Sequence, residues 1–300
     1  MGFKNYSDML EERILHVGLV QMQMSESISE NLGCARELVH EAVSKGAEIV
    51  CLPELFSTRY FAQSMEKRYF RLAEKESGET TNFLLGLARE SKVLIVGGSF
   101  YELGEEEKRY NTCLVVDSKG EIAGKYRKIH IPSDPFYWEQ FYFSDGNLGY
   151  VQVQHEKAKI APLICYDQWF PEAARANVLA GAEVLFYPTA IGWFEEMKEK
   201  ESNSRQRWED AIRSHASLNG VYTVAVNRAW VEGDLNFWGG SFVADPNGEV
   251  LYRCAENRAE VAVVEIDLNK VTKSQQSWGF LGNRKPKSYD SLTRVGESKQ

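Results

Sequence analysis

Short apolar runs alternate with amphipathic segments along most of the chain. The amphipathic segment after Ser27 has apolar residues at helical spacing, and Ser27 with Glu30 forms the pattern of a capping box. Thr80 begins a second helical pattern, and a third, rich in alanine, covers 172–180. The apolar runs are short and contain many β-branched residues. They predict strands at 14–21, 49–52, 93–101, 111–117, 121–127 and 159–164.

Two sequence patterns occur twice, in the same order and at similar spacing. Residues 46–53 read Gly-Ala-Glu-Ile-Val-x-x-Pro, and residues 181–188, at an offset of 135, read Gly-Ala-Glu-Val-Leu-x-x-Pro. Residues 117–122 read Asp-x-x-Gly-Glu-Ile, a hairpin-turn pattern that returns at 245–250 at an offset of 128. The repeats indicate an internal duplication. Two mixed halves packed sheet against sheet predict an α/β fold, a four-layer α-β-β-α sandwich with an internal pseudo-two-fold duplication.

The stretch 159–172 places one cysteine between a strand and a helix. The apolar run ends at Cys165, and Pro171-Glu172 then begins the alanine-rich helix, with proline at its first position. Cys165 is therefore predicted on a strand-to-helix turn, where a thiol can project into a cleft close to backbone N–H groups. A free cysteine is also often a small core hydrophobe, and this stretch alone leaves both interpretations open.

Two more ionisable residues directly follow predicted strands. Glu54 comes after the buried run 49–52 and Pro53, a place where partial burial raises the pKa of a carboxyl group towards that of a general base. Lys128 follows the strand predicted at 121–127, where an ammonium can hold a developing oxyanion. A surface acid and a solvated lysine are the ordinary alternatives. A thiol, a carboxylate and an ammonium, each at a strand end, together favour nucleophilic catalysis.

Composition and charge exclude several classes of protein. The 300 residues have a net charge of −8 with no basic cluster, so we expect no nucleic-acid partner. No apolar run reaches membrane-spanning length, so we expect no membrane partner. The five cysteines are widely spaced without a C-x-x-C pair, which favours a cytoplasmic protein with neither disulfides nor a thiolate zinc site. No H-E-x-x-H, P-loop or G-x-G-x-x-G pattern occurs, so neither a metal nor an organic cofactor is expected.

Three short segments resemble the signature blocks of the nitrilase, or carbon–nitrogen hydrolase, superfamily. They are Leu52-Pro53-Glu54, Tyr126-Arg127-Lys128-x-His130, and Ile164-Cys165-Tyr166-Asp167 followed by Pro171-Glu172. The resemblance covers residues 14–290 and implies an αββα fold without metal or organic cofactor. It implies a catalytic triad of Glu54, Lys128 and Cys165, with Glu139 as a second catalytic glutamate. It also assigns the backbone N–H of Tyr166 to the oxyanion site.

Within that superfamily, longer stretches are most similar to the N-carbamoylputrescine amidohydrolases, enzymes of polyamine biosynthesis. These stretches are 55–61, 130–135, 141–143, 165–175 and 187–192. The resemblance implies that a small ureido amine, N-carbamoylputrescine, is cleaved to putrescine, ammonia and carbon dioxide. Tyr166 stands where tryptophan is common, and the loop 193–196 is unusual. Two alternatives therefore stay open: another amide or ureido substrate (an N-carbamoyl amino acid, β-ureidopropionate or an ω-amide), or binding without catalysis.

Charge near the nucleophile favours a cationic substrate tail. Relatives that act on N-carbamoyl amino acids often carry arginines just after the nucleophile, whereas Asp167, Gln168 and Trp169 stand here. We expect some members of a set of aromatic residues to wall an apolar channel and to contact a terminal ammonium through cation–π interactions: Tyr60, Phe136, Tyr137, Trp138, Trp169 and Trp193. Asp167 either binds substrate or fixes the turn around Cys165, and Trp169 either contacts substrate or packs in the core. The candidate substrate-binding residues are Tyr60, Trp138, Asp167, Trp169, Ala190 and Glu195.

Changes in character along the sequence divide the chain into three parts. We expect an N-terminal extension at 1–13, a single hydrolase domain at 14–266 and a C-terminal arm at 267–300. The arm is polar and carries the isolated aromatic residues Trp278 and Phe280. Apolar anchors on such an arm dock on the body or on a neighbouring subunit, so a homo-oligomer is expected.

Overall fold

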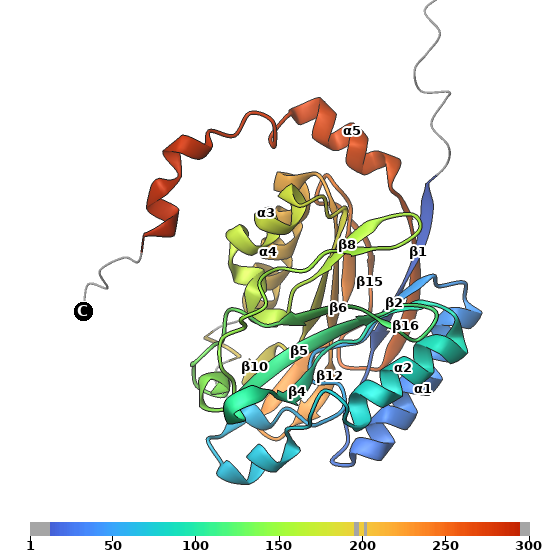
Figure 1. Ribbon diagram of the computed structural model, residues 1–300, viewed down its shortest axis with the longest axis vertical. Helices are drawn as coiled ribbons and strands as arrows, with labels where there is room; N and C mark the ends of the chain where they lie inside the picture. The colour runs from blue at the N-terminus through green and yellow to red at the C-terminus, as the bar shows by residue number, and fades with distance from the viewer. Residues whose placement is uncertain (1–12, 195–197, 201–202, 295–300) are drawn as a thin grey trace, which may run out of the picture.

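Two β-sheets lie face to face between two layers of helices (Figure 1). The computed structural model describes residues 13–194, 198–200 and 203–294. Helices α1 and α2 cover the outer face of the first sheet, and α3 and α4 cover the outer face of the second. The helices are α1 (Ile28–Ser44), α2 (Glu79–Ser91), α3 (Pro171–Leu179), α4 (Ser204–Asn219) and α5 (Asn269–Trp278).

Each main sheet combines parallel central strands with antiparallel strands at its sides. The first sheet has the order β16-β1-β2-β3-β5-β4, with β6 also paired to β5. Its strands are β1 (Ile14–Gln21), β2 (Ile49–Cys51), β3 (Leu94–Val96), β4 (Phe100–Leu103), β5 (Arg109–Val116), β6 (Ile122–Arg127) and β16 (Glu260–Asp267). The second sheet has the order β15-β14-β11-β9-β8-β7. Its strands are β7 (Val153–Gln154), β8 (Lys159–Pro162), β9 (Val184–Thr189), β11 (Tyr222–Asn227), β14 (Phe242–Ala244) and β15 (Val250–Arg253).

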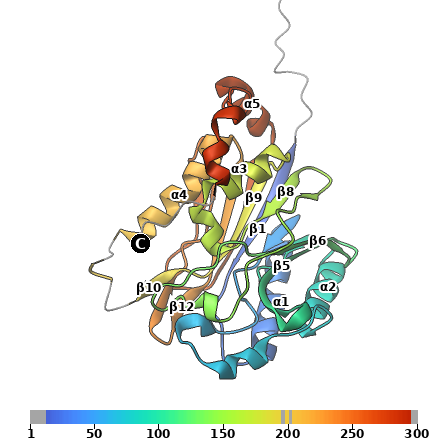
Figure 2. The same ribbon diagram turned by 60° about the vertical axis from the view of Figure 1, so that its left-hand side comes forward.

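A third, smaller sheet lies at one end of the sandwich (Figure 2). It has the order β10-β13-β12, with β10 (Gly192–Phe194), β12 (Ala229–Glu232) and β13 (Leu235–Trp238). β10 begins at Gly192, shortly after the central strand β9 ends at Thr189. The small sheet therefore lies at the end of the sandwich where the loops that follow the central strands come together.

The strand pairing confirms the internal duplication. In the first half β1, β2 and β3 pair in parallel, and β3-β5 and β5-β6 are antiparallel. In the second half β8, β9 and β11 pair in parallel, and β11-β14 and β14-β15 are antiparallel. Even the register shift next to the hairpin turn recurs, between Val115 and Val116 and between Val243 and Ala244.

The repeated Gly-Ala-Glu pattern has a structural reason. Glu48 and Glu183 each stand at the start of a parallel strand and accept a backbone N–H from the neighbouring strand of the same half. Each also pairs with a cation that precedes the first of the parallel strands of the other half, Glu48 with Lys157 before β8 and Glu183 with Arg13 before β1. The two glutamates therefore join strands within a half and the two halves to each other.

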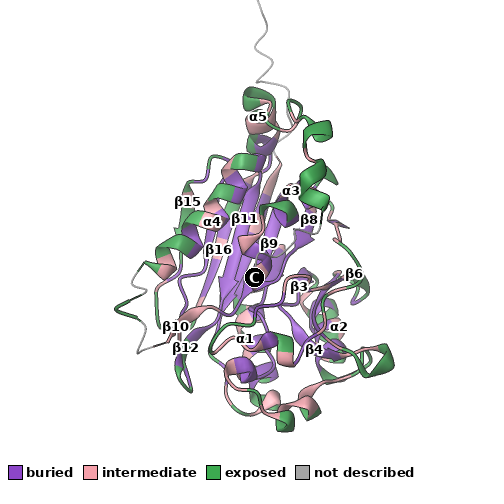
Figure 3. Ribbon diagram, turned by 90° about the vertical axis from the view of Figure 1, so that its left-hand side faces the viewer, coloured by how far each residue is buried: buried purple, intermediate pink, exposed green. Residues whose placement is uncertain are grey.

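The interior between the sheets is apolar and well covered. Val17 and Val96 of the first sheet belong to the same buried cluster as Phe186 and Val224 of the second. Figure 3 shows both sheets buried and the outward sides of the helices exposed. All five cysteines are free thiols, as the sequence predicts. No helix in the described part of the chain is both long and apolar enough to cross a membrane.

The predicted strands at 93–101 and 159–164 need correction. The first is two strands, β3 and β4, separated by Gly98 with a φ of +57°. A Cβ on Gly98 would lie 2.1 Å from the carbonyl oxygen of Pro53, so glycine lets this turn approach the chain just before Glu54. The second strand ends at Pro162, the N–H of Leu163 still bonds to the carbonyl of Phe186 on β9, and the chain then turns towards Cys165.

The C-terminal segment is held on the body along α5 (Figures 1 and 2). Ser274 donates to the carbonyl oxygen of Pro246 at 3.3 Å, Gln275 donates to that of Asn219 at 3.2 Å, and Leu281 packs against the core cluster. It begins as the helix α5, whereas the sequence predicted an irregular arm. Trp278 and Phe280 stack on each other with ring centroids 5.5 Å apart and remain 65% and 44% exposed. Docking of these rings on the body is therefore wrong, and docking on a neighbouring subunit stays a prediction.

Candidate active site

A buried ammonium lies between two buried carboxylates at one end of the first sheet. Lys128 follows β6, and its Nζ donates to Glu54 Oε1 at 2.8 Å and to Glu139 Oε2 at 2.7 Å. Glu54 follows β2, and Glu139 begins a short 3-10 helix, Glu139–Phe141. All three side chains are at most 1% exposed. Charges this deeply buried persist only when they are paired in this way.

The pairing sets the protonation of these groups. Burial alone would lower the pKa of Lys128, but the carboxylates of Glu139 and Glu54 outweigh it and leave that pKa raised. Lys128 therefore remains an ammonium at neutral pH. Burial also raises the pKa of Glu139 to about 7, since the pull of Lys128 in the opposite direction only partly compensates. The site thus contains a fixed cation and a carboxyl group that titrates near neutrality.

Cys165 occupies the predicted turn between a strand and a helix. It lies three residues after the end of β8 and begins a five-residue 3-10 helix, Cys165–Trp169, which ends two residues before α3 begins at Pro171. Its φ is +40°, a strained value for a residue with a Cβ. Burial, with a further contribution from Glu54, raises the pKa of the thiol well above its usual value, and Lys128 opposes this. The sulfur therefore rests as a thiol and needs a base to become a nucleophile.

The carboxylate of Glu54 is oriented through one of its oxygens. Oε1 accepts from Lys128 and from Asn111 Nδ2, both at 2.8 Å. Oε2 is buried and has no hydrogen-bond partner among the described residues. One oxygen is thus held and the other is free to accept a proton. Asn111 is a functional residue that the sequence analysis missed, and its only signal was a polar residue near the start of an otherwise apolar strand.

Asp167 fixes the turn that carries the cysteine. Its Oδ1 accepts the backbone N–H of His130 at 3.1 Å and lies 2.7 Å from the Nδ1 atom of that ring. Its Oδ2 accepts from Tyr126 Oη at 2.7 Å and from the backbone N–H of Ile164 at 2.9 Å. Asp167 is fully buried and does not line the cavity described below. The geometry favours its role in the turn over contact with a substrate.

Arg228, which the sequence analysis also missed, holds the segment after Glu54. It is fully buried at the end of β11 and pairs with Glu232 at 2.8 Å. Its Nη2 donates to the carbonyl oxygens of Glu54, Leu55 and Thr58 at 2.9, 2.8 and 3.2 Å. A side chain of the second half thereby fixes the backbone of a candidate catalytic residue of the first.

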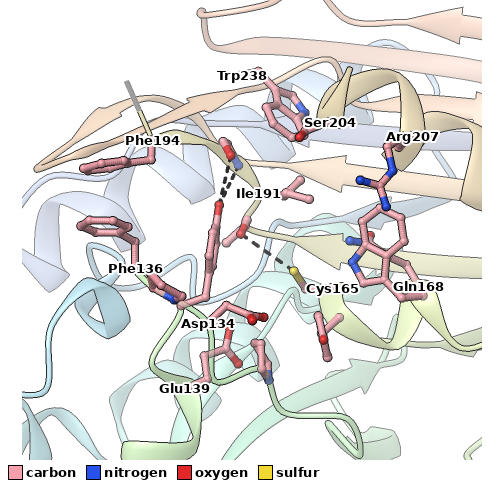
Figure 4. A pocket seen from close by; sticks show the side chains of 17 residues that line it. Asp134, Phe136, Glu139, Cys165, Gln168, Ile191, Phe194, Ser204, Arg207 and Trp238 are labelled. Carbon is pink, nitrogen blue, oxygen red and sulfur yellow. Dashed lines mark hydrogen bonds between the residues drawn. The ribbon is translucent and has the colours of Figure 1, made fainter. Parts of the chain in front are cut away.

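A cavity of about 680 Å³ opens above the cysteine (Figure 4). Cys165, Glu139 and the predicted residues Tyr166, Trp169 and Ala190 line it. Cys165 Sγ lies 3.8 Å from the carbonyl oxygen of Ala190. Phe136 and Tyr137, which the sequence analysis expected in an aromatic wall, also line it. The rest of the wall comprises residues that were not singled out as substrate contacts: Pro132, Asp134, Pro135, Gln168, Ile191, Gly192, Phe194, Ser204, Arg207 and Trp238.

Besides Asp167, two predicted substrate-binding residues, Tyr60 and Trp138, are not brought to this cavity. Tyr60 is fully buried, and its hydroxyl donates to Glu139 Oε1 at 2.7 Å, so it supports the carboxylate instead. Trp138 is half-buried outside the cavity wall. Glu195 lies outside the described residues. The aromatic wall combines the expected rings of Phe136, Tyr137 and Trp169 with Phe194, whose ring centroid lies 3.7 Å from that of Phe136.

The start of the 3-10 helix supplies a place for negative charge. The first N–H groups of a helix have no partner within it, and Tyr166 is the second residue of this one. Its N–H and the ammonium of Lys128 are the donors expected at an oxyanion. No group of three or more His, Cys, Asp and Glu side chains that could hold a metal ion occurs within residues 13–194, 198–200 and 203–294.

Comparison with known proteins gives consistent matches along the chain. A family model described as carbon-nitrogen hydrolase matches residues 16–276. The N-carbamoylputrescine amidase of Arabidopsis thaliana is 39% identical, covering 92% of this chain and 94% of its own. The one from Solanum tuberosum is 38% identical, covering 96% and 98%. The crystal structure of a carbon-nitrogen hydrolase from Helicobacter pylori G27 has a TM-score of 0.89 and 34% identity, covering 94% of this chain and 99% of that one.

Proposed function

The chain belongs to the carbon–nitrogen hydrolase family, and from this premise we propose that it hydrolyses N-carbamoylputrescine to putrescine, ammonia and carbon dioxide. The observation that carries the proposal is the buried Lys128 ammonium held between Glu54 and Glu139, next to a strained cysteine that faces the cavity. This arrangement supplies a nucleophile, a base and an electrostatic clamp in one place.

In the first step, the free Oε2 of Glu54 takes the proton of Cys165 and the sulfur attacks the ureido carbon. The carbonyl oxygen gains negative charge, which Lys128 and the N–H of Tyr166 stabilise. Removal of one such donor costs about 3–4 kcal/mol of transition-state stabilisation. Glu54 then returns the proton to the departing nitrogen, the carbon–nitrogen bond breaks, and ammonia leaves an S-carbamoyl thioester on the cysteine.

In the second step, Glu54 removes a proton from water, which attacks the thioester. The carbon–sulfur bond breaks, the thiolate regains a proton, and the product is an N-alkyl carbamic acid. This acid decomposes to putrescine and carbon dioxide, so the balance consumes one ureido amine and one water. Glu139 contributes by holding Lys128 in position.

The choice of an ammonium-tailed substrate rests on the cavity and on the relatives. Asp134 and Glu139 place carboxyl groups on the cavity wall, and Tyr137 and Phe194 offer apolar surface to a methylene chain. The plant proteins to which the chain is similar are named N-carbamoylputrescine amidase, and the similarity covers 94% and 98% of their length.

Ammonia release tests the proposal. The purified chain is assayed with N-carbamoylputrescine, N-carbamoyl-β-alanine, an N-carbamoyl α-amino acid and a simple nitrile, alongside the Cys165→Ala variant. We expect preference for N-carbamoylputrescine and no turnover by the variant. Normal turnover by Cys165→Ala would refute the mechanism, and preference for another member of the panel would refute the substrate.

We further propose a cytoplasmic homo-oligomer, with a hydrolase domain at 14–266 and the arm at 267–300 as a contact between subunits. The exposed stacked rings of Trp278 and Phe280 support the contact, and five free thiols support a reducing compartment. Light scattering after size exclusion is expected to give a mass above that of one chain. A Trp278→Ser/Phe280→Ser double variant is expected to lower that mass.

A further inference from the structure

Two buried hydrogen-bond donors on the cavity wall have no acceptor in the protein. Gln168 and Trp238 are both fully buried and both line the cavity. Within the described residues, neither Gln168 Nε2 nor Trp238 Nε1 has a hydrogen-bond partner. Buried donors without partners are uncommon because each costs free energy, so these two indicate a group that supplies acceptors when it is bound.

The orientation of the Gln168 amide is fixed by its neighbour. Its Oε1 accepts the indole N–H of Trp208 at 2.9 Å, and an indole N–H can only donate. The other end of the amide must therefore be the NH₂ group. The indole N–H of Trp238 is likewise a donor in any state. Both groups seek an oxygen acceptor and not an ammonium.

The N-terminus of α4 contributes more positive potential to the same wall. Ser204 and Arg207, on the first turn of this 16-residue helix, line the cavity, and no side chain caps the helix at Asn203. Unpaired N–H groups and the helix dipole favour an anion there. Arg205 and Arg213 of α4 pair with Glu209, whereas Arg207 forms no ion pair with any described carboxylate.

Donors and acceptors thus occupy different parts of the wall. Figure 4 shows Trp238, Ser204, Arg207 and Gln168 on the side of α4, with Asp134 and Glu139 below Cys165. We propose that Gln168, Trp238, Ser204 and Arg207 form a carboxylate-binding subsite, and that the enzyme also hydrolyses linear ureido acids whose tail ends in a carboxylate. This inference rests on the proposed ureido chemistry at Cys165 and extends its substrate class.

The reaction at the ureido group is unchanged for such a substrate. Cys165 forms the same S-carbamoyl thioester with loss of ammonia, and water releases a carbamic acid that yields carbon dioxide and an amino acid. A tail with both an ammonium and a carboxylate can use Asp134 and Arg207 together. The sequence analysis sought arginines next to the nucleophile, whereas this one comes from α4.

The test compares two substrates with the same number of methylene groups, N-carbamoylputrescine and δ-ureidovalerate, on the full chain. We expect hydrolysis of both. Arg207→Gln should raise KM for δ-ureidovalerate about 10–100-fold and lower KM for N-carbamoylputrescine, because it removes attraction for one tail and repulsion of the other. Trp238→Phe, which keeps the ring but loses the N–H, should raise KM for δ-ureidovalerate alone. Arg213→Gln, which removes the same charge from α4 away from the cavity, should change neither.

Each outcome separates this inference from the proposed function. Turnover of N-carbamoylputrescine, with δ-ureidovalerate neither hydrolysed nor inhibitory, overturns the subsite and leaves the proposed function intact. Turnover of δ-ureidovalerate alone, with the expected Arg207 dependence, supports the subsite and overturns the proposed substrate. If neither is hydrolysed, calorimetric titration of Cys165→Ala with δ-ureidovalerate decides, and binding that Arg207→Gln does not weaken overturns the subsite.

Discussion

The hydrogen bond from Asn111 to Glu54 offers a direct test of how the base is oriented. Asn111 is fully buried, and its amide holds Oε1 at 2.8 Å together with Lys128. A hydrogen bond to a charged group contributes about 1.5–3 kcal/mol. Asn111→Ala removes this hydrogen bond, so Glu54 Oε2 is no longer confined to one direction. If the whole energy of the hydrogen bond is lost from transition-state stabilisation, kcat/KM falls about 10–150-fold, since about 1.4 kcal/mol corresponds to a tenfold change.

The assay combines turnover with the reactivity of the cysteine. Ammonia release from N-carbamoylputrescine should show the loss mainly in kcat, because Asn111 does not line the cavity. The rate at which iodoacetamide alkylates Cys165 should fall in parallel, since the same carboxylate accepts the thiol proton. Asn177→Ala is the matched control: that asparagine is also fully buried, but it bonds to Gln152 and the carbonyl of Ala173 on α3. It should lower Tm without changing kcat.

Two results would contradict this account. A folded Asn111→Ala protein with kcat/KM within about twofold of the original would show that Lys128 alone orients Glu54. A parallel loss of kcat in Asn177→Ala would show that the effect is general destabilisation. Asn111→Asp should be less active than Asn111→Ala, because a second carboxylate against Glu54 favours retention of a proton there.

Four further predictions concern three residues around the site, Glu139, Asp167 and Arg228. kcat/KM should rise with pH through an acid limb near 7, the pKa of Glu139, and Glu139→Gln should lose this limb in a pH profile. Folding raises the pKa of Glu139, so the protonated carboxyl group stabilises the folded state. This contribution is complete below about pH 4.3 and is lost as the pH rises through about 7. The Tm of Glu139→Gln relative to that of the original protein should therefore increase over that pH range. Asp167→Asn should lower the free energy of unfolding in urea by about 1–3 kcal/mol. The NH₂ group of the new asparagine must face one of the groups that now lie against the carboxylate, from Tyr126, His130 or Ile164. Arg228→Met should cost about 3–5 kcal/mol, because it leaves Glu232 buried and unpaired, and Arg228→Met/Glu232→Leu should recover part of it.

Much of the fold could be predicted because its signals are local. The capping residue Ser27 accepts the N–H of Glu30, as the capping-box pattern predicts, and Gly120 has the positive φ expected of the hairpin turn. The repeats predicted the duplication because each preserves a local hydrogen-bond pattern. The division of 93–101 into two strands was missed because it depends on a close approach between Gly98 and Pro53, far apart in sequence.

The candidate site was predictable only where a residue ends a strand or belongs to a recognised motif. Glu54, Lys128 and Cys165 met that condition. Arg228 did not, since its partners Glu54 and Leu55 lie 174 and 173 residues away and nothing in the local pattern links them. Arg207 was missed for a related reason: helical spacing does not say which exposed residue of α4 faces a cavity formed by other loops.

The site is asymmetric although the fold is nearly symmetric. The repeat equates Glu54, which follows Pro53, with Thr189, which follows Pro188. Ala190, the residue after Thr189, places its carbonyl next to the Cys165 sulfur. The segment that follows the repeated proline therefore supplies a base in one half and part of the cavity wall in the other. The base and the ammonium come from the first half, and the nucleophile comes from the second. Neither half contains the full set, so the chemistry depends on how firmly contacts such as those of Arg228 hold the halves together. Arg228→Met should therefore lower kcat as well as stability, even at temperatures where the protein remains folded.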